Sequence, residues 1–192
     1  MIIHFIASSQ KAVANIGNYR AIVKAIHAQG AMLAADWVEP AYLYMKEGKR
    51  ASQEHWENTY QEHIEALARS DIVIAEVSDS SFGAGFQVAT AIQQKKPILL
   101  LIRKNKADEG TFNVGVNNSF VSKHYYDADN IESIVAKFIK DNTIETKDLR
   151  FNFFIDREIY NYLRWTALRT GTTKAEILRK LVTREIERKN ED

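Results

Sequence analysis

Three short apolar runs, separated by amphipathic stretches, constrain the fold of the chain more than any other feature of the sequence. The runs are IIHFIA at residues 2–7, DIVIAEV at 71–77 and PILLLI at 97–102. The stretch after the first run has helical spacing and stops at Gly30, a residue typical of helix ends. Buried strands that alternate with helices are typical of a parallel α/β sheet. We therefore expect an α/β fold for residues 1–141.

The stretches between these runs supply the remaining elements. AMLAADWV, at residues 31–38, predicts a weaker second strand. Residues 51–70 predict a polar helix. We expect its inward face to consist of Trp56, Tyr60, Ile64 and Leu67. HYYD and a helix near 129–140 complete the unit.

A change of composition divides the chain. DNTIETKD has no apolar periodicity, and we take residues 142–148 as a linker between the first domain and a second one at 149–192. From residue 147 onward, 11 Lys/Arg oppose 8 Asp/Glu, a balance of +3. The formal net charge of the whole chain is only +1. The C-terminal end is therefore modestly basic.

Composition excludes several classes of site. The absence of cysteine rules out disulfides, thiol catalysis and cysteine-ligated zinc. The five histidines lack a ligand spacing, so we expect no metal and no cofactor. No apolar run approaches the roughly 20 residues of a membrane span. We expect a cytoplasmic protein with no membrane partner.

The stretch VSDSSFGAGF, which follows the second apolar run, predicts a ligand loop. In an open parallel sheet, ligands bind where such loops lead into helix N-termini. Gly83 and Gly85 let the backbone approach a ligand, and Ser78 and Ser81 offer hydroxyls. The alternative is a tight strand-to-helix turn whose glycines serve packing alone.

Residues 66–101, ALARSDIVIAEVSDSSFGAGFQVATAIQQKKPILLL, resemble the core of the nucleoside 2-deoxyribosyltransferase-like family, and especially its 2′-deoxynucleoside 5′-phosphate N-hydrolases. HFIASSQ is similar to the family's first strand and phosphate loop. The resemblance implies a flavodoxin-like, five-stranded parallel sheet with helices on both faces. It also implies cleavage of the N-glycosidic bond of a deoxynucleotide.

The resemblance places the family's catalytic positions on unusual residues. Its nucleophilic Glu corresponds to Gln87, its Asp to His63, and the Tyr of its first strand to His4. The implied ligand-binding residues are Ser8, Gln10, Ser78, Ser81, Gly83 and Gly85. A neutral amide is a feeble nucleophile, so we expect a site that binds a nucleotide or nucleoside without turnover, and hence not an enzyme.

Two nearby carboxylates leave an alternative open. Glu76 and Asp79 follow the second apolar run and could supply a displaced nucleophile. Acids at the end of a strand more often cap the next helix or pair with a base. An active N-glycosidase or deoxyribosyltransferase that acts through altered residues remains the second hypothesis.

The C-terminal residues have a compact pattern of their own. Phe151, Phe153 and Ile155 alternate with Arg150, Asn152 and Phe154, as in a two-faced strand. Two amphipathic stretches follow, and Thr173 with Glu176 predicts a capping box at the second. About forty residues with one strand make a poor core, so pairing with a second copy is the simple solution.

LRFNFFIDREIYNYLRWTALRTGTTKAEILRKLVTREI resembles a ribbon-helix-helix domain of the Arc/MetJ/CopG type. The resemblance implies a homodimer that lays its paired strands in the major groove of double-stranded DNA. Arg150, Asn152 and Phe154 would face bases, while Thr173 and Lys174 would hold phosphates. A dimerisation module without DNA binding is the alternative. The hypothesis for the whole chain is a nucleotide-responsive, homo-oligomeric DNA-binding regulator.

Overall fold

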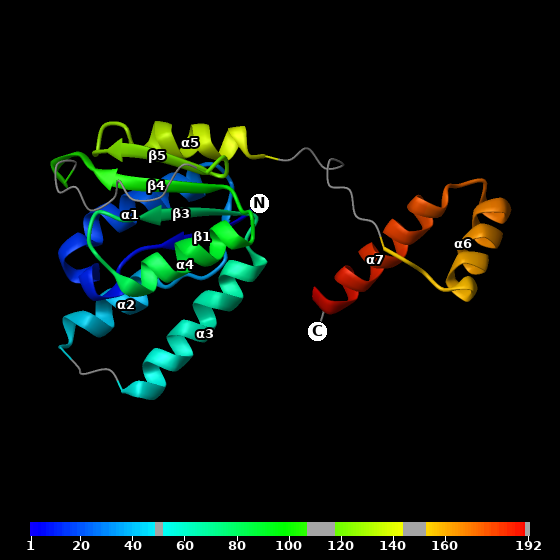
Figure 1. The fold of residues 1–192 in the computed structure, drawn as a ribbon, viewed down its shortest axis with the longest axis horizontal. Coiled ribbons are helices and arrows are strands. Elements are labelled where there is room, and N and C mark those ends of the chain that lie inside the picture. Colours follow the sequence, from blue (N-terminus) through cyan, green and yellow to red (C-terminus); the bar gives the residue numbers. More distant parts are fainter. Residues whose placement is uncertain (49–51, 107–117, 144–152, 191–192) are drawn as a thin grey trace. The chain divides into compact units, whose positions relative to one another are not determined.

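The computed structural model describes residues 1–48, 52–106, 118–143 and 153–190, with the side chains of 189 and 190 left out. The chain divides into two compact units, Met1–Thr143 and Ile144–Asp192 (Figure 1). In the described residues, no helix is long and apolar enough to cross a membrane.

The first unit is built on a five-stranded sheet in which every pairing is parallel. The strands lie in the order β2-β1-β3-β4-β5, the doubly wound order of flavodoxin-like folds. Their bounds are Ile2–Ile6 (β1), Met32–Leu33 (β2), Ile72–Glu76 (β3), Ile98–Arg103 (β4) and Val121–Tyr126 (β5). The predicted α/β fold with a five-stranded parallel sheet is confirmed.

Helices connect these strands. They are Ala12–Ala28 (α1), Val38–Lys46 (α2), Gln53–Arg69 (α3), Phe82–Gln93 (α4) and Ile131–Asp141 (α5), with short 3-10 turns at Ser9–Lys11 (η1) and Lys104–Lys106 (η2). Gly30 has a φ of 68°, the left-handed conformation expected just after a helix. The prediction for AMLAADWV was too long, because only two of its residues pair with β1 and Val38 already begins α2.

Helices cover both faces of the sheet (Figure 1), and an apolar core lies on each face. On one face, residues of α1 and α5 pack against Ile3, Phe5, Ile74 and Leu101. On the other, residues of α3 and α4 pack against Val73, Ala75, Ile98 and Leu100. Successive strand side chains point to opposite faces, so His4, between Ile3 and Phe5, faces α3 and α4.

The inward face of α3 differs from the prediction. Leu67 is fully buried, whereas Trp56 is 36% exposed and Tyr60 is 51% exposed. The helix packs on the sheet through its C-terminal half, and its N-terminal half borders the cavities described below. The apolar stripe of α3 therefore packs in the core near the C-terminal end of the helix and lines a cavity near its N-terminal end.

In the second unit, the described residues form two helices, Arg157–Thr170 (α6) and Lys174–Asn190 (α7). Between them, Gly171 adopts a left-handed φ of 66°. Thr173 and Glu176 form the predicted capping box, because the Glu176 amide donates to Thr173 Oγ1 at 3.2 Å and the Thr173 amide donates to Glu176 Oε2 at 2.9 Å. Arg150, Phe151 and Asn152 of the predicted strand lie outside the described residues, whereas Phe153, Phe154 and Ile155 are described and do not form a strand.

Candidate active site

His4, His63 and Gln87 come together on the sheet face that α3 and α4 cover. His4 Nε2 lies 2.9 Å from Gln87 Oε1, and this hydrogen bond joins β1 to α4. The His4 and His63 rings are in edge contact, with centroids 5.5 Å apart, which joins β1 to α3. Three residues that the sequence placed on separate elements therefore form one cluster.

The cluster is electrically neutral. Burial lowers the pKa of His4 to about 4, against a smaller rise from its hydrogen bond to Gln87, and the nearby His63 and Lys96 lower it further. Burial also lowers the pKa of His63. An amide oxygen can only accept, so the contact with Gln87 places the His4 proton on Nε2. Both rings then act as uncharged imidazoles at neutral pH.

Two adjoining cavities border this cluster. The first, which we name the aromatic cavity, has a volume of about 310 Å³ and is lined by residues of α2, α3 and the segment before α2. The second, the loop cavity, has a volume of about 180 Å³ and is lined by residues of α3, α4 and the end of β1. The residues Ser9, Trp56, Thr59 and His63 line both. The two cavities therefore form neighbouring compartments around His63.

The predicted glycine loop forms the start of α4 and borders the loop cavity. Ser81 and Gly83 line it together with Gln87. The Ser81 hydroxyl also accepts from the Ala84 amide at 3.3 Å and so caps the helix. A Cβ added at Gly83 or Gly85 would meet no atom within 4 Å, so packing does not require these glycines. Open space at the helix start favours a ligand loop over a packing turn.

Four of the predicted ligand-binding residues line neither described cavity. Ser8 and Ser78 are buried, and Gln10 and Gly85 are exposed. The Ser8 carbonyl accepts from Tyr19 at 3.1 Å. The Ser78 hydroxyl donates to Glu76 and accepts from the Arg103 amide. Ser78 is therefore part of a second polar cluster.

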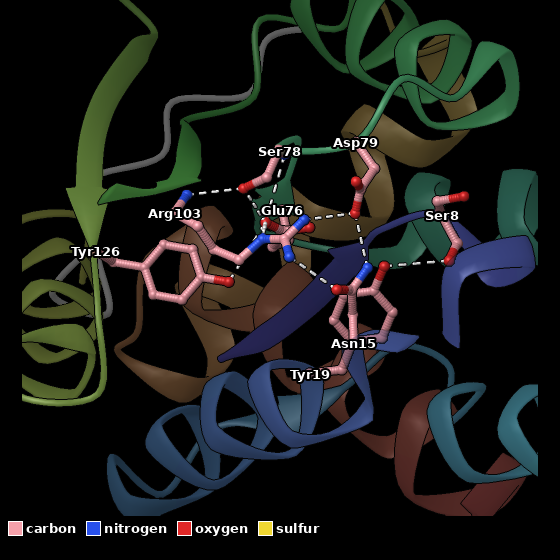
Figure 2. Close-up of polar contacts among 8 residues, drawn as sticks. All are labelled: Ser8, Asn15, Tyr19, Glu76, Ser78, Asp79, Arg103 and Tyr126. Carbon is pink, nitrogen blue, oxygen red and sulfur yellow. Dashed lines mark hydrogen bonds and ion pairs between the residues drawn. The ribbon is translucent and has the colours of Figure 1, made fainter. Parts of the chain in front are cut away.

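Figure 2 shows this second cluster, which is centred on the Arg103 guanidinium at the end of β4. Arg103 donates to Asp79 Oδ2 at 2.5 Å and to Asn15 Oδ1 at 2.8 Å, and its Nε lies 3.4 Å from Glu76 Oε1. Asn15 in turn donates to Asp79 at 2.7 Å. Tyr126 of β5 donates to Glu76 at 3.3 Å. One guanidinium thus joins α1 to the ends of β3 and β4.

This network decides the role of Glu76 and Asp79. Both carboxylates pair with Arg103, as acids at a strand end commonly do, and neither lines a described cavity. Burial raises the pKa of Glu76, and the Ser78 hydroxyl and Arg103 oppose that rise. The hypothesis of a displaced nucleophile at Glu76 or Asp79 is therefore not supported by the geometry.

Sequence reasoning missed the aromatic cavity. Trp37 lines it beside Tyr44 and His55, whose rings stack in parallel with centroids 4.3 Å apart. The sequence signal was the density of aromatic residues between positions 37 and 60, but α2 itself was not predicted. In the described residues, no group of three His, Asp or Glu side chains is placed to hold a metal ion.

Curated relatives of the chain are nucleotide N-hydrolases. The 5-hydroxymethyl-dUMP N-hydrolase of Esox lucius is 27% identical over 142 residues, which are 73% of this chain and 97% of that protein. The enzyme of the same name from Tetraodon nigroviridis is 33% identical over 39% of this chain and 54% of its own length. The "Putative 2'-deoxynucleoside 5'-phosphate N-hydrolase 1" of Methanosarcina mazei is 28% identical over 64% of this chain and 73% of its own. No protein-family model matches the chain.

These relatives correct one prediction from the sequence. The expectation that the chain is not an enzyme is wrong, because the similarity extends to proteins that are named as hydrolases. The amide at position 87 does not by itself exclude hydrolysis, because the neutral imidazole of His63 lies in the same cluster and can accept a hydrogen bond or a proton from water. Over about three quarters of its length, this chain is similar in sequence to a protein that is named as a nucleotide N-hydrolase.

Proposed function

We propose that residues 1–141 bind a deoxynucleoside 5′-phosphate and hydrolyse its N-glycosidic bond. The observation that carries the proposal is the meeting of His4, His63 and Gln87 beside the start of α4. Two of the relatives are named for the hydrolysis of 5-hydroxymethyl-dUMP, which is such a nucleotide.

The phosphate would bind in the loop cavity. Free amides at the start of α4 and the positive end of the helix dipole favour an anion there. Ser81 lines this cavity and adds a hydroxyl. Because His63 lines both cavities, a phosphate in the loop cavity would leave the aromatic cavity for the base.

Water is the nucleophile that best fits the cluster. Without a carboxylate at position 87, a covalent sugar–enzyme intermediate is disfavoured, and water would attack the anomeric carbon directly. His63 is a buried, neutral imidazole whose Nδ1 has no hydrogen-bond partner, and it would accept the proton of that water. His4 would fix the Gln87 amide through their hydrogen bond.

Loss of the Ser81 hydroxyl tests the phosphate site. We expect Ser81→Ala to lower the kcat/KM for base release from deoxynucleoside monophosphates about 10-fold to 100-fold, the effect of one hydrogen bond to a charged group. Ser52→Ala is the matched control, because Ser52 caps α3 in the same way and lies outside both cavities. Chromatography of released base measures both. Absence of base release from every nucleotide tried, with the wild-type protein folded, would refute hydrolysis.

We also propose that residues 149–192 form a ribbon-helix-helix homodimer that binds double-stranded DNA, joined to the first domain by a linker at 142–148. The observation that favours it is apolar exposure. Leu163 and Ile177 are the only buried apolar side chains in the described part of α6 and α7. Large apolar side chains are exposed at Phe154, Trp165, Leu168, Val182 and Ile186. Such a surface needs a partner.

A charge placed on this apolar surface tests the dimer. We expect Ile186→Glu to convert a dimer into a monomer in analytical ultracentrifugation, because the carboxylate would have to be buried unpaired. Thr183→Glu adds the same charge at an exposed polar position of the same helix and should leave the dimer intact. Fluorescence anisotropy with promoter DNA distinguishes a DNA-binding dimer from a purely structural one. Arg150→Ala and Lys174→Ala are the variants to compare with the wild type.

A further inference from the structure

The walls of the aromatic cavity suit a flat group. Trp37, Tyr44 and Trp56 line it, and Tyr44 is held by its parallel stack on His55, with an interplanar angle of 6°. Trp37 is fixed from behind, because its ring nitrogen donates to the Phe5 carbonyl at 2.7 Å. A volume of about 310 Å³ is ample for a heteroaromatic base. The cavity is therefore a preformed aromatic compartment next to His63.

The charged side chains that line this compartment, among the described residues, are acidic. Asp36 and Glu62 line it, and among the residues that the structure describes no lysine or arginine does so. The faces of aromatic rings are also electronegative and attract cations. His63, one of the polar side chains shared with the loop cavity, is nine-tenths buried, and its Nδ1 has no hydrogen-bond partner. The electrostatics of this cavity therefore oppose those of the loop cavity, where the helix start favours an anion.

We propose that the aromatic cavity binds a positively charged heteroaromatic base, so that the substrate is a quaternised N-glycoside carrying a 5′-phosphate, such as a nucleotide of a 7-alkylpurine. This inference rests on the proposed hydrolysis and specifies its substrate. The cation lies between Trp37, Tyr44 and Trp56, near the carboxylates of Asp36 and Glu62. The phosphate lies at the start of α4.

The chemistry of such a substrate fits the residues that replace the expected carboxylates. When the bond from the anomeric carbon to the ring nitrogen breaks, both electrons go to that nitrogen and cancel the positive charge of the base. The base leaves as a neutral molecule and needs no proton from an acid. Water supplies the oxygen that bonds to the anomeric carbon, and its proton passes to His63 and then to solvent. One water is consumed, and one proton is released with the base and the sugar phosphate.

A neutral base makes a different demand on the site. Its departing nitrogen carries the electron pair as a developing negative charge and needs a general acid. His4 and His63 are both uncharged imidazoles at neutral pH, and Gln87 has no acidic proton. The cluster can therefore assist water but cannot readily protonate a leaving base. Selection of a cationic base would follow from both the cavity and the catalytic cluster.

A matched pair of nucleotides tests this. In mildly acidic buffer, 7-methyl-dGMP carries a positive base, whereas dGMP has the same sugar and phosphate with a neutral one. We expect calorimetry to show at least about tenfold tighter binding of 7-methyl-dGMP, the size of a desolvated cation–π contact. The rate of base release, corrected for the spontaneous base loss of each nucleotide, should also be higher for 7-methyl-dGMP than for dGMP. Equal or tighter binding of dGMP would overturn the inference while leaving the hydrolysis of neutral nucleotides intact.

Substitutions of the two acidic residues in the aromatic cavity test whether this cavity causes the preference for the cationic base. Glu62→Gln combined with Asp36→Asn should reduce the preference for 7-methyl-dGMP over dGMP to within about twofold. Glu65→Gln, one turn away on α3 and outside the cavity, should keep the full preference. Retention of the preference in the double variant would overturn the assignment. Failure of both nucleotides to lose base, with a preserved difference in binding, would refute the proposed hydrolysis and leave the binding site standing.

Discussion

Arg103→Met should lower the free energy of unfolding by about 3–5 kcal/mol at neutral pH, the typical effect of removing one partner from a buried ion pair. Arg103 is only 15% exposed and contacts Glu76, Asp79 and Asn15. Methionine keeps much of the side-chain volume but removes the charge and all the donors. Glu76, which is 98% buried, would then carry an uncompensated charge. Urea denaturation followed by circular dichroism measures the loss.

The loss should also depend on pH in a defined direction. Burial raises the pKa of Glu76 above its ordinary 4.5, and Arg103 opposes that rise, so the variant should raise this pKa further. A group whose folded pKa lies above its unfolded value stabilises the fold below that unfolded value and loses this contribution as pH rises. The deficit of Arg103→Met should therefore grow from about pH 4.5 toward neutrality.

Arg20→Met is the matched control. Arg20 makes a bidentate ion pair with Glu39 on the surface, where the two side chains are 53% and 48% exposed. The same change there should lower the free energy of unfolding far less, because solvent screens an exposed ion pair. Equal losses in the two variants, or a loss at position 103 that does not change with pH, would contradict the role of Arg103 in neutralising Glu76.

The network has a consequence for the candidate site. Asp79 lies two residues before Ser81, the cap of α4, and is held by Arg103 and by Asn15 of α1. The Ser8 carbonyl, in the loop after β1, is held by Tyr19 of the same helix. Both loops at this edge of the sheet are thus tied to α1, one by a buried and one by a partly buried hydrogen bond. Such support lets exposed glycines remain ordered at the start of α4.

The sheet was predictable from the sequence because its strands are nearly continuous apolar runs. β3 and β4 are buried on both faces and contain few polar residues, which distinguishes them from the helices around them. β5 was harder, since four of its six residues are exposed. α2 was missed because its first turn contains Pro40 and only Val38 is buried, so it has little apolar periodicity.

The candidate site was predictable only in part. Resemblance to a family located positions 4, 63 and 87, and the structure brings these residues into contact. The aromatic cavity was hidden because Trp56 and Tyr60 fit an apolar helical stripe, and periodicity cannot distinguish a core from a cavity wall. The Arg103 network was hidden as well, because it joins residues separated by up to 88 positions in the sequence. Both features depend on tertiary placement.

Gln87→Glu combined with His63→Asp should increase base release from dGMP by at least about 100-fold, the lower end of what a positioned acid or base contributes. The new carboxylate at position 87 would accept a hydrogen bond from His4 Nε2 across the present 2.9 Å contact, and its ionised form could attack the anomeric carbon. The new carboxyl at position 63 would supply a proton to a neutral leaving base. In this double variant, 7-methyl-dGMP should also lose much of its advantage over dGMP in base release, because the methylated base needs no acid and gains nothing from the new carboxyl.

Gln93→Glu controls for added charge, since Gln93 is exposed on the same helix and lines neither described cavity. Gln87→Glu alone should gain less than the double variant, because a leaving base would still lack an acid. A folded double variant that binds dGMP as tightly as the wild type, yet releases base no faster, would show that these positions do not face the reacting bond. Stopped assays of free guanine, with thermal melting as a check on folding, decide between these outcomes. A gain in the double variant would show that the catalytic geometry is intact and that the residues at positions 63 and 87 select the substrate.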